Sequence, residues 1–599
     1  MCGVGGYFLR PGVEPPDGVL DRMDEALAHR GPDGVGRFVD NRVGFVHRRL
    51  SIIDVVNGAQ PFMKTDESGT KVLVANAEIY NHVELRAELA QEFPFLSQSD
   101  CETLFAIWTL HGTKVFSRLR GMYAAAMYDS VTGEGVLLRD PFGIKPLYYS
   151  ETKYGVFFAS EPTALRFAGM NSGSPDTLHA ACIIDRQYAP DNLPAFMPIR
   201  RVAPGETLFI SNGQVVSRKN NSLLDGIQLS QKATTNEFRD MLHDSVSVHL
   251  MSDVPIGLFF SGGVDSAAIL ASMAALRTAF GSSRTEPLLA YTCRFDPDRR
   301  AETDKARALA KAVGASFVDV VYSKKDFWNN VGSAAFAMDD AAADYAILPM
   351  MHLAARAAQD VKVILSGEGG DEFFAGYGRY RAGLRYLRPK FPTRPGPAIR
   401  AGLFPAATAR RLLAIYQSSG LRMPSLGDRV VRRQCALTQL QVYDIEDWLP
   451  NDLLIKLDRC LMRYGLEGRT PFVDRRLSTY GLSLPLSAKV SSGKGKYIVK
   501  SWLSETMPAC KPFERKRGFT VPVGIWIAEE ASRLVPLVAK QPGITGLMSK
   551  SQVAGVFNAA AGRGGLLAWR ILFYALWHQV HWCSADYNAP LLDILADVN

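Results

Sequence analysis

The sequence lacks the features that mark exported, membrane-bound or zinc-binding proteins. Its eight cysteines are scattered, without a Cys-x-x-Cys pair, which excludes the usual structural zinc patterns and favours a reducing compartment. No uncharged apolar run approaches about 20 residues, and the first residues form neither a basic nor an apolar signal region. We therefore expect a cytoplasmic protein with no membrane partner.

A strong charge of one sign is also missing. The formal net charge is +8 over 599 residues, and the basic residues are dispersed apart from short clusters such as Arg515-Lys516-Arg517. This balance gives no reason to expect nucleic acid as a partner. A hydrophobic content of 47% is ordinary for globular chains, and the length predicts about two to four domains.

The first part of the chain is rich in short apolar runs separated by turn-forming residues. These runs predict strands at 4–9, 43–46, 72–75, 123–128, 135–138, 156–159 and 207–210. We expect a sheet-rich α+β domain over residues 1–215. The polar stretch 216–235 lacks periodicity and is interpreted as a linker.

After this stretch, strands and helices alternate. The pattern predicts helices at 234–251, 267–280, 302–313 and 347–359, and strands at 256–260, 287–295, 317–321 and 361–365. Such alternation is typical of a parallel sheet covered on both faces, hence an α/β domain. Beyond Gly376 the chain is mainly helical. We assign 236–586 to this domain and 587–599 to a C-terminal tail.

Cys2 follows the initiator methionine. Removal of Met1 would make it the first residue, with a thiol nucleophile and an α-amine able to act as its base. Far along the chain, Ser261-Gly262-Gly263-Val264-Asp265-Ser266 joins a predicted strand to a predicted helix, where backbone N–H groups can hold a pyrophosphate. No Walker-type Gly-x-x-x-x-Gly-Lys-Ser/Thr motif is present.

Four further motifs accompany Cys2: His29–Gly34, Arg48–Asp54, Asn76–His82 and Ser99–Glu102. In this order they resemble the class II glutamine amidotransferase domain, whose fold is the αββα sandwich of the N-terminal nucleophile (Ntn) hydrolases. The resemblance implies that Cys2 attacks glutamine, and that the Asn76 side chain and the N–H of Ala77 stabilise the oxyanion. Glutamine is a zwitterion, so Arg49 suits its carboxylate and Glu78 with Asp100 its ammonium. Ile53 completes the glutamine-binding set implied by the resemblance.

Ala77 departs from this family, which usually has glycine after the asparagine. If the backbone there required a positive φ, alanine would cost about 1 kcal/mol or more. We then expect weakened glutamine hydrolysis, which Ala77→Gly would restore.

The second half resembles the ATP-pyrophosphatase domain of asparagine synthetases. The similarity rests on the 261–266 loop, on Leu365–Tyr377, and on segments 457–474 and 516–522. It implies catalytic roles for Glu368 and Lys516, and Mg²⁺ binding by Asp265 and Asp371. The implied ATP-binding residues are Phe260, Ser261, Gly262, Gly263, Asp265, Ser266, Cys293, Ser366 and Gly367. Lys496 is equally compatible with phosphate contact and with a solvated surface position.

The match weakens where the acid substrate is expected. Asp339-Asp340-Ala341 stands where the family usually has an Asp-Glu-Pro-like stretch, and Phe317-Val318-Asp319 replaces a His-x-Glu motif. Cys293-Arg294 stands near the expected adenine position, which is normally aliphatic or small. These departures leave the ATP-binding residues in place and bear on the acceptor.

The combined resemblance implies a glutamine-dependent amidotransferase that uses ATP and Mg²⁺. Ammonia released at Cys2 would pass through a channel to an acyl-adenylate, with aspartate as the default acid and a homodimer as the expected assembly. A specialised carboxylate acceptor is an alternative. A synthetase that closes an intramolecular amide is another, although Cys2 argues against it. A non-enzymatic nucleotide-binding regulator is disfavoured by the intact Asp265 and Glu368.

Overall fold

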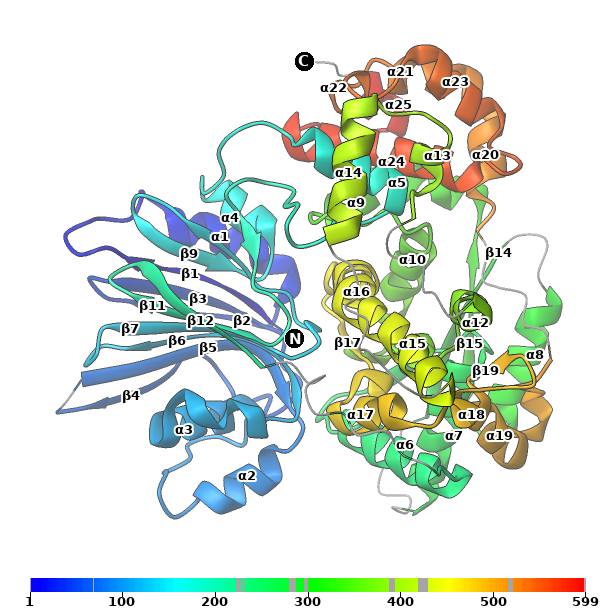
Figure 1. Ribbon diagram of the computed structural model, residues 1–599. Coiled ribbons are helices and arrows are strands. Elements are labelled where there is room, and N and C mark those ends of the chain that lie inside the picture. Colours follow the sequence, from blue (N-terminus) through cyan, green and yellow to red (C-terminus); the bar gives the residue numbers. More distant parts are fainter. Residues whose placement is uncertain are drawn as a thin grey trace.

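The computed structural model describes residues 2–67, 69–221, 227, 230, 232–279, 287–295, 300–386, 394–418, 429–514 and 521–596. Figure 1 shows two halves side by side. A β-sandwich built from the first part of the chain, in blue and cyan, faces a mixed helical and sheet half in green to red.

The sandwich consists of two six-stranded antiparallel sheets. The first has the order β10 (Arg200–Arg201), β8 (Tyr148–Glu151), β9 (Gly155–Ala159), β1 (Gly3–Leu9), β3 (Val43–Arg49), β2 (Gly34–Val39). The second has the order β12 (Gln214–Asn220), β11 (Glu206–Ser211), β7 (Glu134–Arg139), β6 (Gly121–Asp129), β5 (Gly69–Ile79), β4 (Phe62–Asp66). Alternate side chains of both sheets, such as Phe8, Phe45, Val74 and Leu137, are buried between them.

Helices cover both outer faces of the sandwich. α1 (Val19–Leu27) and α4 (Pro162–Phe167) pack on the first sheet, while α2 (His82–Leu89) and α3 (Asp100–His111) lie on the side of the second. The predicted αββα arrangement of an Ntn hydrolase-type domain is therefore confirmed. All seven predicted strands are present, and β2, β4, β8, β10 and β12 are additional.

The predicted linker starts too early. β12 continues to Asn220 and pairs with β11 over its length, so residues 216–220 belong to the sheet. The polar sequence of β12 misled the prediction because this edge strand is largely exposed. The next helix, α6 (Thr235–His249), begins with a capping box between Thr234 and Glu237.

The second half is built on a parallel sheet, as predicted. Its order is β15 (Ser316–Tyr322), β14 (Leu289–Phe295), β13 (Ile256–Phe259), β16 (Val363–Leu365), β17 (Glu467–Arg469), and every neighbouring pair is parallel. α6 and α7 (Val264–Ala279) share one buried cluster with Leu258 and Leu365. α9 (Lys324–Ala337) and α10 (Ile347–Ala357) share another with Phe259 and Ile364, so helices cover both faces.

The C-terminal part is helical and centred on α24 (Gly565–Trp582), nearly all of which is buried. α24 packs against α9 and also against α5 (Thr177–Arg186), which comes from the N-terminal region. The predicted tail contains a helix, α25 (Leu591–Ala596), whose Ile594 and Leu595 are buried, so that prediction was wrong from residue 591. Among the described residues no helix is both long and apolar enough to cross a membrane.

Buried ion pairs join the two halves. Arg30 of the sandwich, with no exposed surface, donates to Asp458 of α16 (Leu454–Met462) at 2.8 and 3.0 Å. Arg201 makes a bidentate pair with Asp340 at 2.5 and 2.7 Å. Burial would raise the pKa of Asp340, but the Arg201 guanidinium holds it below its usual value. The sandwich thus supplies a cation to each of these buried carboxylates, and Asp458 also pairs with Arg459 of its own half at 2.8 Å.

This arrangement predicts that Arg201→Ala destabilises the protein strongly. Removing one partner leaves Asp340 as a buried charge without its guanidinium, at a cost of about 3–5 kcal/mol. Thermal unfolding monitored by circular dichroism should show a clearly lowered midpoint. The control is Arg533→Ala, which breaks an exposed pair with Glu530 that is worth about 0–1 kcal/mol. Equal midpoints for the two variants would contradict this account of the boundary.

Candidate active sites

Cys2 lies at the start of β1 in the first sheet, beside Asn76 of β5 in the second. The backbone N–H of Cys2 donates to Asn76 Oδ1 at 3.0 Å, and both residues are buried. Burial raises the pKa of the Cys2 thiol, so a nearby base is needed to activate it. Asn76 Nδ2 is buried and has no hydrogen-bond partner among the described residues. A free amide donor thus lies beside the predicted nucleophile.

The strand register indicates where the N–H of Ala77 points. Hydrogen-bonded and non-bonded residue pairs alternate along an antiparallel ladder. Tyr80 donates across to Arg120 at 2.7 Å, which places Ala77, opposite Tyr123, in the non-bonded set. Its N–H and C=O therefore point away from β6, and the carbonyl faces the Cys101 thiol at 3.6 Å.

The expected strain at Ala77 is absent. Ala77 lies within β5 and is not one of the residues with a positive φ. An extended backbone accommodates a methyl group, so the prediction of a conformational cost was wrong.

Arg49 is the last residue of β3, and its side chain contacts the loop that follows Ile53. Its guanidinium donates to the carbonyl of Asp54 at 2.5 Å and to that of Val55 at 3.0 Å. Asp54 has a φ of 48°, which turns the loop toward the arginine. Arg49 therefore contacts the two residues that follow Ile53 in the same segment.

Glu78 is buried on β5 of the second sheet, and Asp100 is buried on the helix that covers this sheet. Asp100, the first residue of α3, accepts a hydrogen bond from the N–H of Ile79 at 2.7 Å. Burial raises the pKa of both carboxyls. Glu78 also lies 3.0 Å from Nη2 of Arg469, which belongs to the other half of the molecule and was not among the predicted site residues.

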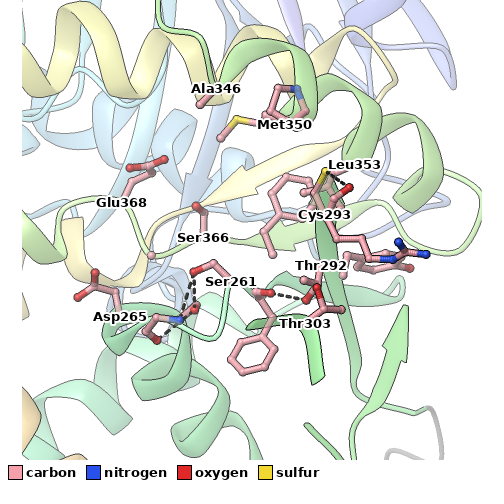
Figure 2. Close-up of a pocket in the computed structure, with 18 of the residues that line it drawn as sticks. Ser261, Asp265, Thr292, Cys293, Thr303, Ala346, Met350, Leu353, Ser366 and Glu368 are labelled. Carbon is pink, nitrogen blue, oxygen red and sulfur yellow. Dashed lines mark hydrogen bonds between the residues drawn. The ribbon is translucent and has the colours of Figure 1, made fainter. Parts of the chain in front are cut away.

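A second site is a cavity of about 350 Å³ at the carboxyl ends of β13, β14 and β16. This edge is where open parallel sheets place their ligands. Figure 2 shows Asp265 and Glu368 toward one end, Ser261 and Ser366 in the middle, and Cys293 and Leu353 toward the other. The cavity thus has an acidic, hydroxyl-rich end and a more apolar end.

Most of the predicted ATP-binding residues line this cavity, as do Glu368 and Asp371. The lining members of the predicted set are Phe260, Ser261, Gly263, Asp265, Ser266, Cys293, Ser366 and Gly367. Gly262 does not line it and instead turns the loop with a φ of 67°. Lys516 lies outside the described residues.

Asp265 and Asp371 meet at the ammonium group of Lys496. Their oxygens lie 2.5 and 2.7 Å from its Nζ atom, and burial lowers its pKa less than these two carboxylates raise it. Two hard oxygen donors around one cation, beside a phosphate-binding loop, form a donor set that suits Mg²⁺. Lys496 is buried, which contradicts the solvated surface position, while contact with phosphate stays a prediction.

Lys456, in α16, is a cavity residue that the sequence analysis missed. Its Nζ lies 2.6 Å from Asp344, and it is the main positive charge opposing the burial that raises the pKa of Glu368. Lys456 immediately precedes segment 457–474, which carries the family resemblance, but no motif in the sequence marks Lys456 itself as a site residue.

Asp339 and Asp340, at which the sequence departs from the family, both pair with arginine side chains. Asp339 accepts from Arg459 at 2.8 Å and Asp340 pairs with Arg201, and neither lines the cavity. Asp319 pairs with Arg294 at 3.1 Å and Arg307 at 3.0 Å. Asp340 thus pairs across the boundary, and Asp339 also crosses it by accepting a hydrogen bond from the N–H of Thr163 at 3.0 Å.

Comparisons with known proteins match both halves. A glutamine amidotransferase domain matches residues 1–220, and asparagine synthase matches residues 237–579. The chain is 30% identical to the glutamine-hydrolysing asparagine synthetase 1 of Bacillus subtilis, with 97% of both chains covered. It is 27% identical to asparagine synthetase B of Escherichia coli, covering 88% of this chain and 83% of that one. It is 28% identical to Amidase chyE of Penicillium rubens, covering 84% and 86%.

The strand geometry of Ala77 predicts that Ala77→Gly does not improve glutamine hydrolysis. Glycine gains nothing where φ is already negative, and inside a strand it costs about 0.5–1 kcal/mol of stability. We expect an unchanged or lower turnover of glutamine to glutamate in a coupled glutamate assay. A higher turnover at unchanged stability would show that the methyl group obstructs the site.

Proposed function

The chain belongs to the asparagine synthase family and is a glutamine-dependent, ATP-consuming carbon–nitrogen ligase, and we propose that its two sites carry out successive half-reactions with aspartate as the acceptor. The observation that carries the proposal is that both sites occur in one chain. The side-chain nitrogen of Asn76 lies beside Cys2 and has no hydrogen-bond partner among the described residues, and the 261–266 loop lines a cavity in the other half.

In the first half-reaction, the Cys2 thiolate attacks the side-chain amide carbon of glutamine. The α-amine that is exposed when Met1 is removed takes the thiol proton. The developing oxyanion is held by Asn76 Nδ2 and the outward-pointing N–H of Ala77, two donors fixed by neighbouring residues of β5. Ammonia leaves with the proton, and water then hydrolyses the thioester to glutamate.

Glutamine is oriented by its two charged groups. Arg49 receives the carboxylate, and Glu78 with Asp100 receives the ammonium, which matches the opposite charges of these side chains. Ile53 lies in the loop that Arg49 holds. Binding both charges fixes the amide carbon relative to Cys2.

In the second half-reaction, an acid carboxylate attacks the α-phosphorus of ATP and pyrophosphate leaves. The 261–266 loop binds the pyrophosphate part, and Ser366 and Gly367 contact the nucleotide, whose base lies near Cys293 and Leu353. Asp265 and Asp371 would hold Mg²⁺, which neutralises phosphate charge when bound. Lys496 pairs with both carboxylates and keeps them together.

Ammonia then attacks the carbonyl carbon of the acyl-adenylate, and AMP leaves with the former carboxylate oxygen. Glu368 lies in the cavity wall with a pKa raised by burial, which suits it to accept the proton that the attacking nitrogen loses. The ammonia reaches this site through the boundary between the two halves. A catalytic role for Lys516 stays a prediction, as does the homodimer.

The identity of the acid is the finer part of the proposal. Similarity to asparagine synthetases supports aspartate, whereas similarity to a protein named an amidase supports a specialised carboxylate. The test is to supply a panel of acids with ATP and glutamine and to measure pyrophosphate release. Release with aspartate alone supports the first reading, and release with another acid but not with aspartate overturns it.

Cys2→Ala should abolish amide formation from glutamine and retain amide formation from ammonium salts. The substitution removes only the nucleophile of the first site, while the adenylation cavity keeps all its residues. Product amide is measured by mass spectrometry with each nitrogen source. Equal losses with both sources would contradict the separation of the two sites.

Asp265→Asn should impair pyrophosphate release and spare glutamine hydrolysis measured without ATP. The amide keeps the size of the side chain but loses the negative charge that a divalent cation requires. A pyrophosphate assay over a range of Mg²⁺ concentrations should show a higher requirement for the metal. Wild-type release at every concentration would mean that the phosphate loop is misassigned.

A further inference from the structure

Arg469 is fixed by contacts within its own half of the molecule. It stands on β17, the edge strand of the parallel sheet, and has no exposed surface. Its Nε atom lies 2.5 Å from Glu467, and its Nη1 atom donates to the carbonyls of His249 and Met251 at 2.8 and 2.6 Å. The guanidinium therefore has a defined position before the sandwich contributes a partner.

The remaining nitrogen of this side chain crosses the boundary. Nη2 of Arg469 lies 3.0 Å from Oε2 of Glu78, on β5 of the sandwich. Glu78 is itself almost fully buried. A carboxylate in such a place is retained as an anion only when a cation is supplied next to it.

The other groups around Glu78 make this requirement stronger. Asp100 and Glu467 add negative charge, Cys101 and Tyr80 contribute buried neutral groups, and Lys145 lies on the positive side. Burial is the largest influence and raises the pKa of Glu78 well above its usual value, while Arg469 is the strongest influence in the opposite direction.

We propose that Arg469 is a positioning residue of the glutamine site, because its guanidinium, 3.0 Å from Glu78, fixes the carboxyl group that receives the ammonium of glutamine and favours the ionised form of that group. The inference rests on the proposed function, because it takes Glu78 as a glutamine ligand. It makes the glutamine site a composite of both halves, in which the ion-pair partner of Glu78 comes from the other half.

The same residue also reaches the second site through its backbone. The N–H of Ser366, in the wall of the ATP cavity, donates to the carbonyl of Arg469 at 2.8 Å. A side-chain substitution leaves this bond in place. Changes confined to the glutamine site can therefore be separated from damage to the cavity.

The test compares Arg469→Gln, Arg469→Lys and Arg120→Gln in the full-length protein. Without the guanidinium the carboxyl of Glu78 stays protonated to higher pH, so we expect the KM for glutamine at pH 7 to rise by about tenfold or more in Arg469→Gln. This increase should shrink as the pH rises and Glu78 ionises. Lysine keeps the positive charge but lacks the planar guanidinium with its several N–H donors, so Arg469→Lys should raise the KM less, by about threefold to tenfold.

Arg120→Gln is the matched control. Arg120 crosses the same boundary and binds Asp474 at 2.8 and 3.0 Å, but it contacts none of the glutamine ligands. Its loss should leave the KM for glutamine within about twofold of the wild type. Pyrophosphate release with ammonium as the nitrogen source monitors the fold and the ATP site in all variants.

The outcomes are separable. A raised KM that falls with pH in Arg469→Gln, absent in Arg120→Gln, supports the inference. A KM within twofold of the wild type, or an increase that is the same at every pH, overturns it. If Arg469→Gln does not fold, Arg469→Lys decides, and a wild-type KM in that variant overturns the inference. Failure of Cys2→Ala to affect glutamine use would instead overturn the proposed function.

Discussion

Charge buried at the boundary between the two halves is the constraint on which the rest of the structure depends. Arg30, Arg201 and Arg469 each lie in this boundary and meet carboxylates that the opposite half provides. A buried charge without a partner would be strongly unfavourable, so these groups are stabilised only when the two halves pack against each other. The boundary therefore does more than hold two domains together, since one of its ion pairs includes Glu78, a residue of the proposed glutamine site.

Sheets of two kinds, an antiparallel pair and one parallel sheet, hold the two proposed sites. The facing antiparallel sheets bring Cys2 and Asn76 together from strands that are far apart in the sequence. The parallel sheet collects the ends of β13, β14 and β16 into one cavity. β17 belongs to the parallel sheet, yet its Arg469 reaches Glu78 in the sandwich. β17 thus contacts residues of both proposed sites.

Sequence patterns were sufficient for the fold class, for the positions of most strands along the chain and for motifs that line the cavity, because these depend on local periodicity and on short motifs. They did not show what depends on distant pairing. Nothing near residue 77 reveals its strand conformation, and nothing near Asp340 reveals Arg201 as its partner. The polar strand β12 was taken for a linker for a related reason, since its pairing with β11 is invisible in its composition.

Transfer of nitrogen from one site to the other within a single chain is the central claim. The direct measurement supplies glutamine labelled with ¹⁵N in its amide, ATP, an accepted acid and an excess of unlabelled ammonium, and determines the isotope in the product amide by mass spectrometry. The account predicts that the product carries ¹⁵N despite the competing ammonium, because ammonia passes through the buried boundary. A product with unlabelled nitrogen, formed while labelled glutamine is hydrolysed, would contradict it.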